Sequence, residues 1–439
     1  MKIKYFLELE KYDSYKINTI LGEKFKKYVQ ELSLKEIYKQ DSNGKFYFKY
    51  VGLICVEDLI IAVLPKYLEK ITHKNNEINE KNLSRTMKAL KKYNRISIDE
   101  QLETLGKQEE KYKFKNMFAI IDFLFKDYIE YNLYENHIEK YELNGEGEIN
   151  WEYTIETETA YLSNKNPIYL NYWTNDSESN NGDFIMSLHK HILNLCVERL
   201  TKSEIQQITQ ILEVPKVSFI VEEERLGELE YQIKMIDNEL KIQYGERKIR
   251  LLKAMKLFLN NHNYEADENL LLLGTPTFYT VWERACGDVL GNQYSVNSQH
   301  HKTISQKTRA HWKDLNNHKS SAMRPDIVYK TENIFYIVDA KYYTEEGIKD
   351  LGVQDIAKQY MYHQALEIKG ENKKYKNIFI SPGKKDKKFS EITMPLFKDK
   401  IIYSVIVEGN KLLQSYIEGK REKEEYLLEL CSEKPKITQ

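Results

Sequence analysis

The chain has 439 residues, of which 41% are hydrophobic, so it can bury sizeable cores; at about 150 residues per domain, two or three domains are expected. Its 66 Lys and Arg nearly balance its 67 Asp and Glu, so any surface for nucleic acid must be a local patch. Four cysteines without Cys-x-x-Cys spacing, early charges at the N-terminus and the lack of an apolar run of about 20 residues argue against a disulfide framework, a secretory signal and a membrane span. We therefore expect a cytoplasmic protein with no membrane partner.

The first predicted domain, residues 1–105, has mixed α/β character. Within residues 45–64, two apolar runs rich in β-branched and aromatic residues flank Glu57 and Asp58, which is typical of a β-hairpin. Residues 79–93 are polar and favour a helix.

The second predicted domain, residues 106–260, is expected to be largely helical. Apolar residues at helical spacing predict helices over about 110–140 and 184–200. The segment Asn-Gly-Glu-Gly-Glu at 144–148 breaks the helical pattern between them. A strand is predicted at 217–221, and the charged stretch after it indicates helices with a solvated face.

The third predicted domain, residues 261–439, alternates helices and strands. A helix is expected to begin at Pro276 with Thr275 as its N-cap, followed by a polar and basic loop and then by two apolar strands. The later elements are a helix over 353–368, strands at 377–380 and 401–407, and an amphipathic helix from Asn410. The fold class is therefore mixed α/β (α+β), with a mixed sheet flanked by helices in this last domain.

Two carboxylates and an amine interrupt the apolar strand pair of the third domain. In a hairpin centred near Glu332, Asp326 lies opposite Val338 or Asp339, so the two carboxylates reach the same level of the sheet. Asp339 and Lys341 are two residues apart and share a face. An ordinary hairpin with polar ends accounts for Asp326, but it does not explain why charges interrupt the second apolar run. The pattern favours a Mg²⁺ site for phosphodiester hydrolysis.

The order helix, strand, strand, helix, strand, with Pro325-Asp326 and Asp339-Ala340-Lys341, resembles the PD-(D/E)XK nuclease superfamily. The resemblance implies that Asp326, Asp339 and the backbone carbonyl of Ala340 hold Mg²⁺, with Mn²⁺ as an alternative. It also implies that Lys341 orients or polarises the attacking water and offsets charge on the phosphorane.

Three further residues enter through the same resemblance. Glu283, on the helix before the strand pair, would be an additional catalytic group and metal ligand; the alternative is an ordinary surface glutamate. Gln359 would be catalytic, and Tyr362 would face the DNA channel. The superfamily often has one more residue between these last two positions, so the chain departs from the pattern there.

Two basic segments are candidates for DNA contact. Lys384 and Lys385 belong to a lysine run beside a strand end, which is either a solvated turn or a phosphate-binding patch. Arg309 lies in the basic loop of the third domain, for which a solvated loop is the alternative to contact with the DNA backbone.

The resemblance extends beyond the nuclease motif. Residues 46–67, 144–155, 278–283 and 324–328 are similar to LlaJI-type restriction endonucleases and the related McrC-like subunits. Such a subunit cleaves double-stranded DNA together with a separate AAA+ GTPase, the McrB-like motor, onto which the N-terminal region would dock. The chain has no GxxxxGK[ST] motif, so a motor would have to be a separate protein.

Two other functions remain open at this point. One is a stand-alone DNA nuclease of another defence or repair system. The other is a non-catalytic stimulator of an NTPase ring, against which the retained charges of Asp326, Asp339 and Lys341 argue, because burying charge costs folding free energy.

Overall fold

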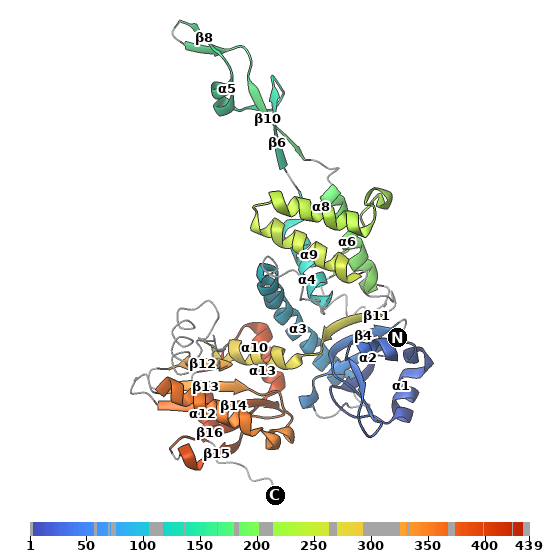
Figure 1. Cartoon of the computed structure of the whole chain (residues 1–439), viewed down its shortest axis with the longest axis vertical. Coiled ribbons are helices and arrows are strands. Elements are labelled where there is room, and N and C mark those ends of the chain that lie inside the picture. Colours follow the sequence, from blue (N-terminus) through green and yellow to red (C-terminus); the bar gives the residue numbers. More distant parts are fainter. Residues whose placement is uncertain are drawn as a thin grey trace, which may run out of the picture. The chain divides into compact units, whose positions relative to one another are not determined.

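The computed structural model describes residues 3–56, 59–68, 71, 76–104, 117–135, 137–164, 166–179, 184–201, 214–262, 270–292, 325–331, 334–367, 374–397, 399–423 and 425–432. The chain divides into two units. Unit 1 comprises Met1–Asp99, Ile205–Leu212 and Asp267–Gln439, and unit 2 comprises Glu100–Glu204 and Glu213–Ala266. The mixed α/β class is confirmed, with helices and strands in both units (Figure 1).

The N-terminal part of unit 1 is built on a four-stranded sheet in the order β1-β5-β4-β11. Strands β4 (Val51–Val56) and β5 (Leu59–Leu64) form the predicted hairpin, and its turn residues 57 and 58 lie outside the described residues. The sheet is completed by β1 (Lys4–Leu7), parallel to β5, and by β11 (Leu270–Thr275), antiparallel to β4. All of β4 is buried, which explains why its sequence is continuously apolar.

Strands β4 and β11 approach closely at a pair of glycines. Gly52 lies opposite Gly274, and Gly52 has a φ of 138°. A Cβ on Gly52 would lie 2.3 Å from the carbonyl oxygen of Leu273, and one on Gly274 would lie 2.2 Å from that of Val51. Only glycine fits at these two paired positions.

Helices and a small hairpin cover this sheet. Helices α1 (Ser14–Lys26) and α2 (Val29–Leu34) share an apolar core with the sheet. Strands β2 (Tyr38–Gln40) and β3 (Phe46–Phe48) pair beside them, and α3 (Asn76–Thr104) begins three residues earlier than predicted and runs longer.

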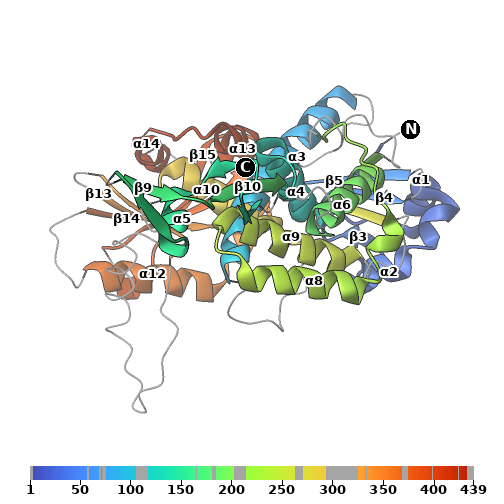
Figure 2. The ribbon, with the colours of Figure 1, turned by 90° about the horizontal axis from the view of Figure 1, so that it is seen from above.

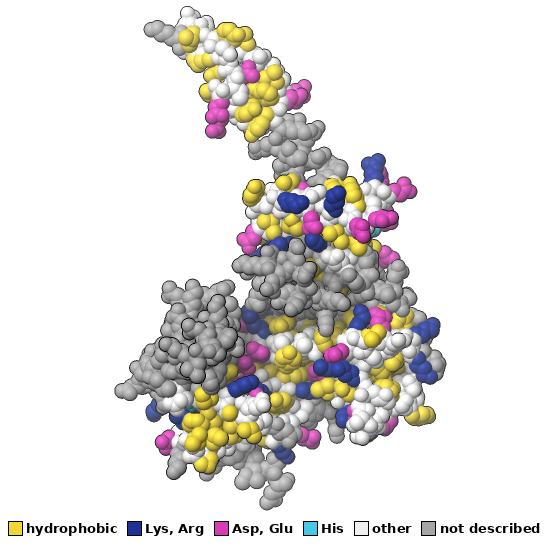
Figure 3. Space-filling view, viewed as in Figure 1, with side chains coloured by type: hydrophobic (Ala, Val, Ile, Leu, Met, Phe, Trp, Pro, Cys, Tyr) yellow, Lys and Arg dark blue, Asp and Glu magenta, His cyan; other side chains and the backbone are white. Residues whose placement is uncertain are grey.

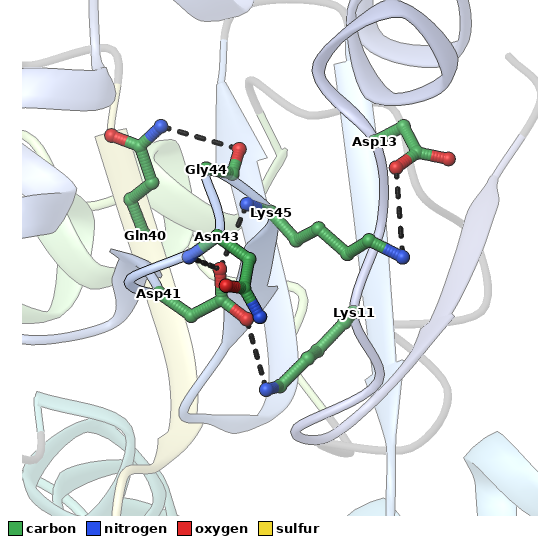
Figure 4. A network of polar contacts seen from close by, with 7 residues as sticks. All are labelled: Lys11, Asp13, Gln40, Asp41, Asn43, Gly44 and Lys45. Carbon is green, nitrogen blue, oxygen red and sulfur yellow. Dashed lines mark hydrogen bonds and ion pairs between the residues drawn. The ribbon is translucent and has the colours of Figure 1, made fainter.

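The turn between β2 and β3 is held by Asp41 (Figure 4). Its Oδ1 accepts from the backbone N–H groups of Asn43 and Lys45, both at 2.9 Å, and its Oδ2 lies 2.9 Å from the Nζ of Lys11. The hydrogen bond from Lys11 is the main cause that lowers the pKa of Asp41 below its ordinary value. The carboxylate therefore ties the turn to the segment before α1.

The C-terminal part of unit 1 contains a five-stranded mixed sheet in the order β12-β13-β14-β16-β15. Strands β13, β14 and β16 are parallel, and the two outer strands are antiparallel to their neighbours. The elements in chain order are α10 (Phe278–Leu290), β12 (Ile327–Lys330), β13 (Ile334–Ala340), α12 (Val353–Glu367), β14 (Lys374–Gly383), β15 (Lys387–Ile392), β16 (Ile402–Glu408), α13 (Gly409–Glu418) and α14 (Tyr426–Ser432). The predicted order of helix, strand, strand, helix and strand is present, while β15 was not predicted.

Helices cover both faces of this sheet (Figure 2). Helix α12 packs on the face that carries Ile337, where Tyr362 contacts that residue. Helix α10 packs on the other face, because Gly287 lies against Ile327, whose partner Val338 alternates with Ile337. Residues at the end of β13 therefore lie between two layers of helices.

Unit 2 contains both helices and strands. Its helices are α4 (Met117–Tyr131), α6 (Phe184–Thr201), α8 (Leu229–Ile242) and α9 (Glu246–His262), which pack on one another. Helix α4 ends earlier than predicted, since Asn132 adopts a left-handed φ of 63°.

Five short strands also belong to unit 2. They form the sheet β6-β10-β7 and the hairpin β8-β9, with α5 (Trp151–Thr157) between them. Their bounds are His137–Leu143 (β6), Glu148–Ile149 (β7), Ala160–Ser163 (β8), Asn166–Tyr169 (β9) and Trp173–Ser179 (β10). Polar residues fill β10, so neither a hydrophobic run nor an alternation marked it. Figure 3 shows apolar side chains on the surface of this region, and exposed ones are Tyr141, Leu143, Trp151, Ile155, Tyr161, Leu162, Ile168 and Leu170.

The predicted strand at 217–221 is wrong. These residues are not part of a strand, and none of the described strands pairs with them. The side-chain amide of Asn194 bonds to the backbone there instead. Its Nδ2 donates to the carbonyl of Phe219 at 2.8 Å, and its Oδ1 accepts from the N–H of Phe219 at 2.9 Å.

The three predicted domains do not coincide with the two units. Residues from the first and the third range lie together in unit 1, and β11, from the third range, pairs with β4 of the first. The division at 105 and 260 stays a prediction. Of the helices in the described part of the chain, none is both long enough and apolar enough to span a bilayer.

Candidate active site

The hairpin of β12 and β13 brings the two predicted carboxylates together. Ile327 pairs with Val338, so one residue further along Asp326 lies opposite Asp339. The backbone N–H of Ala340 donates to Oδ2 of Asp326 at 3.0 Å. Because the N–H and C=O of a strand residue point to the same edge, the carbonyl of Ala340 is expected to face Asp326 as well.

The environment of Asp326 includes the carboxylate of Asp339. Burial, the neighbouring charges of Asp339 and Glu283, and a hydrogen bond with the Asp339 carboxyl raise the pKa of Asp326 to about 8. The N–H of Ala340 opposes this shift in part. Two carboxylates this close disfavour being ionised together, so a cation between them would be stabilised.

Lys341 follows directly after β13 and lies between two acids. Its Nζ is 3.1 Å from Oδ1 of Asp339 and 3.0 Å from Oδ1 of Asp355. Burial by itself lowers the pKa of Lys341, but the two carboxylates outweigh burial and raise it above its ordinary value. Lys341 is therefore a cation at neutral pH.

Asp355 was not predicted from the sequence. It lies in the first turn of α12, where an acid is common because it faces the positive end of the helix dipole. An acid at this position therefore does not by itself indicate a functional site. Its contact with Lys341 depends on the packing of α12 against β13 and β14.

Glu283 comes from α10, on the opposite face of the sheet. Burial and the charge of Asp339 raise its pKa, while Lys341 lowers it in part. Its charge in turn contributes to the raised pKa of Asp326. Glu283 is thus electrostatically coupled to the pair, and its role as a metal ligand stays a prediction.

The donor set fits a hard divalent cation. Among the residues described, no three His, Cys, Asp or Glu side chains are arranged as a complete metal cluster. Mg²⁺ does not require one, since it binds through one or two carboxylates and keeps several waters. Asp326, Asp339 and the carbonyl of Ala340 could supply the protein ligands, and all of them offer oxygen.

Gln359 and Tyr362 are buried between α12 and the sheet. Nε2 of Gln359 donates to the carbonyl of Ile337 at 2.9 Å, and Tyr362 packs against Ile337. In this structure both residues attach α12 to β13. Their predicted roles in catalysis and DNA binding remain predictions.

The lysine run at the end of β14 separates into two kinds of residue. Lys384 and Lys385 are exposed. Lys387 pairs with Glu345 at 2.6 Å, and buried Lys388 donates to the carbonyl of Cys431 at 3.0 Å and to Glu391 at 2.9 Å. Arg309 and the rest of its loop lie outside the described residues.

Comparison with known proteins decides the family. The family model named LlaJI restriction endonuclease matches residues 50–406, which is most of the chain. The chain belongs to the LlaJI restriction endonuclease family. Membership implies that it is a nuclease of a restriction system, as the resemblance suggested.

Individual relatives cover nearly the whole length. The Type II restriction enzyme BsuMI component YdjA of Bacillus subtilis (strain 168) is 26% identical over 449 residues, covering 98% of this chain and 92% of that protein. A half-complex of Thermococcus gammatolerans McrB AAA+ hexamers with bound McrC is similar at a TM-score of 0.42 and 12% identity, over 95% of this chain and 99% of that chain. The T. gammatolerans McrBC complex is similar at a TM-score of 0.26 and 11% identity, over 58% and 79%.

Proposed function

We propose that this member of the LlaJI restriction endonuclease family is a Mg²⁺-dependent DNA endonuclease subunit that works with a separate AAA+ GTPase. The observation that carries the metal-dependent activity is the opposition of Asp326 and Asp339, with the ammonium of Lys341 beside them at 3.1 Å from Asp339. Mn²⁺ is the alternative cation.

The proposed mechanism assigns a role to each group. Bound Mg²⁺ supplies Lewis-acid stabilisation of the phosphate and makes a nearby water more acidic. Asp326 and Asp339 bind the cation, with the carbonyl of Ala340 as a third oxygen ligand. Lys341 orients the water and offsets negative charge that develops on the phosphate in the transition state.

Two observations support a separate motor. The sequence contains no GxxxxGK[ST] motif, which fits a P-loop motor supplied by another protein. The Bacillus relative is named as a component of a restriction enzyme, which implies further components there. The AAA+ GTPase, the double-stranded DNA substrate and the docking of the N-terminal region belong to the proposal.

Replacing Asp339 or Lys341 by alanine tests the site. We expect each variant to lose cleavage of plasmid DNA by about 100-fold or more, because each lacks a group that acts on the transition state. Lys349→Ala, which alters an exposed lysine, is the matched control and should cleave normally. Chelation of Mg²⁺ should stop cleavage, and Ca²⁺ should permit binding without turnover. Cleavage at the native rate by either site variant would show that the site lies elsewhere.

The partner is tested separately. Methylated and unmethylated plasmids are incubated with this chain alone and with its NTPase, in the presence of GTP or ATP. Cleavage that needs the NTPase and its nucleotide supports the two-component system. Cleavage by the chain alone would instead assign it to the stand-alone nucleases.

A further inference from the structure

The ammonium of Lys341 has two acidic partners from different elements. Asp339 is the penultimate residue of β13, and Asp355 comes from the first turn of α12. Their Oδ1 atoms lie 3.1 Å and 3.0 Å from Nζ. The side chains are shielded, with exposed fractions of 16% for Lys341, 10% for Asp339 and 24% for Asp355, so the contacts are less screened than surface ion pairs.

Without a second partner, Lys341 would be poorly positioned. Its backbone is fixed, since its N–H donates to the carbonyl of Ile380 at 2.9 Å. At the other end of the side chain, Nζ lies 5.8 Å from the ring centroid of Phe379. The side chain still has four rotatable bonds, and ordering a lysine side chain costs conformational entropy. The ion pairs are what selects one conformer.

A cation bound to Asp339 would weaken one of these ion pairs. The positive charge offsets the carboxylate that attracts the ammonium and repels the ammonium directly. Asp355 is not among the proposed ligands, and it keeps its charge when the cation binds.

We propose that Asp355 is a positioning residue that holds the ammonium of Lys341 at the reacting phosphate once Asp339 is engaged by the divalent cation. This inference rests on the proposed function. It adds a residue from α12 to the site and explains how one lysine can remain beside a metal ion.

The competing explanation is purely structural. An acid in the first turn of a helix stabilises that helix through the helix dipole. In that case, loss of Asp355 lowers the stability of the protein and leaves Lys341 where it was. The two explanations differ in what happens to Lys341 when a cation is present.

The first test follows the amine directly and needs no cleavage. The full chain is saturated with Ca²⁺ and acylated with a small amine-reactive ester, and modification of Lys341 is followed by peptide mass spectrometry. An amine released from an ion pair is more nucleophilic, so Asp355→Asn should speed modification of Lys341 several-fold. Exposed Lys349 in the same sample is the internal control. An unchanged rate at Lys341 would overturn the inference.

The second test separates catalysis from binding. With enzyme and Mg²⁺ both saturating, Asp355→Asn should slow single-turnover cleavage by about 10- to 100-fold, the cost of a misplaced group. DNA affinity in Ca²⁺ should be unchanged. Gln354→Ala alters the neighbouring exposed residue of the same helix turn and should leave both quantities unchanged.

The outcomes distinguish the inference from the function on which it rests. If Lys341→Ala abolishes cleavage and Asp355→Asn cleaves normally, the site stands and the positioning role is wrong. If Lys341→Ala and Asp339→Ala both cleave normally, the proposed function fails first. Adding Asp355→Asn to Lys341→Ala should reduce the residual rate no further, because Asp355 acts through Lys341; an additional equal loss would contradict that.

Discussion

Asp326 links the site to the stability of the protein. Its pKa lies at about 8, above its ordinary value of 3.8, so the folded protein holds a proton that the unfolded chain releases. A raised pKa contributes stability that is full below the ordinary value and is lost as the pH rises through the folded value. The free energy of unfolding of the metal-free protein should therefore contain a component that declines between about pH 4 and about pH 8.

Urea unfolding at a series of pH values in a chelating buffer measures this decline. Asp326→Asn removes the titrating group and should flatten the pH dependence over that interval. Equal pH dependence of the native and Asp326→Asn proteins over that interval would mean that the pKa of Asp326 is not raised in the folded protein.

Substitutions of two lysines in the same run should affect different properties, DNA binding at Lys385 and stability at Lys388. Lys385→Glu reverses an exposed charge, so if this turn contacts DNA, binding should weaken and the slope of log K against log salt should fall by about 0.9 for each lost phosphate contact. Lys388→Ala instead removes the buried donor to Cys431 and should cost about 1–3 kcal/mol of stability without changing that slope. Salt titrations of DNA affinity, with denaturant unfolding alongside, check both. An unchanged slope for Lys385→Glu would assign the turn to solvent.

At the scale of elements, a side-chain amide forms the backbone hydrogen bonds that a neighbouring strand would otherwise form. Asn194 on α6 bonds both backbone groups of Phe219, in a segment that pairs with none of the described strands. Asn194→Ala should expose the Phe219 amide and accelerate its hydrogen exchange. Asn238→Ala, at an exposed position of α8, is the control. Equal protection of the Phe219 amide in native and Asn194→Ala proteins would contradict the assignment.

At the scale of the whole molecule, residues far apart in sequence meet beside the active site. The hydroxyl of Tyr342, the residue after Lys341, donates to Oε2 of buried Glu8 at 2.7 Å, and Nζ of Lys66 lies 4.5 Å from the Tyr342 ring centroid. Burial raises the pKa of Glu8, and the Tyr342 hydroxyl opposes that shift. This contact ties the N-terminal sheet to the end of β13.

Tyr342→Phe removes that hydroxyl and leaves the buried Glu8 carboxyl with one donor fewer, since it still accepts from the backbone of Lys66. We expect a loss of about 1–3 kcal/mol in the free energy of unfolding, measured by denaturant titration. Tyr279→Phe, at a tyrosine that is 55% exposed, should have little effect. Equal stabilities of native and Tyr342→Phe proteins would show that the contact does not stabilise unit 1.

Local signals explain what could be predicted. The apolar runs of β4, β5 and β13 and the helical spacing of α6 and α10 are strong patterns, and these elements lie where the patterns predicted them, although α10 begins at Phe278 with Thr277, not Thr275, as its N-cap. Strands β10 and β15 have weak patterns in the sequence and form by pairing with β6 and β16, and β15 begins within the lysine run. The wrong prediction at 217–221 has the same cause, because a strand also needs a partner strand, and none of the described strands pairs with this segment.

The sequence by itself determined the mixed α/β class, the β12–β13 hairpin and the order of charged residues along it, because turn chemistry and side-chain alternation act over a few residues. Only the tertiary structure decided that β11 joins the N-terminal sheet, that Asp355 reaches Lys341, and that Gln359 and Lys388 donate to the backbone carbonyls of Ile337 and Cys431. These contacts join residues that are separated along the chain. Such proximity depends on how whole elements pack, and no local pattern encodes it.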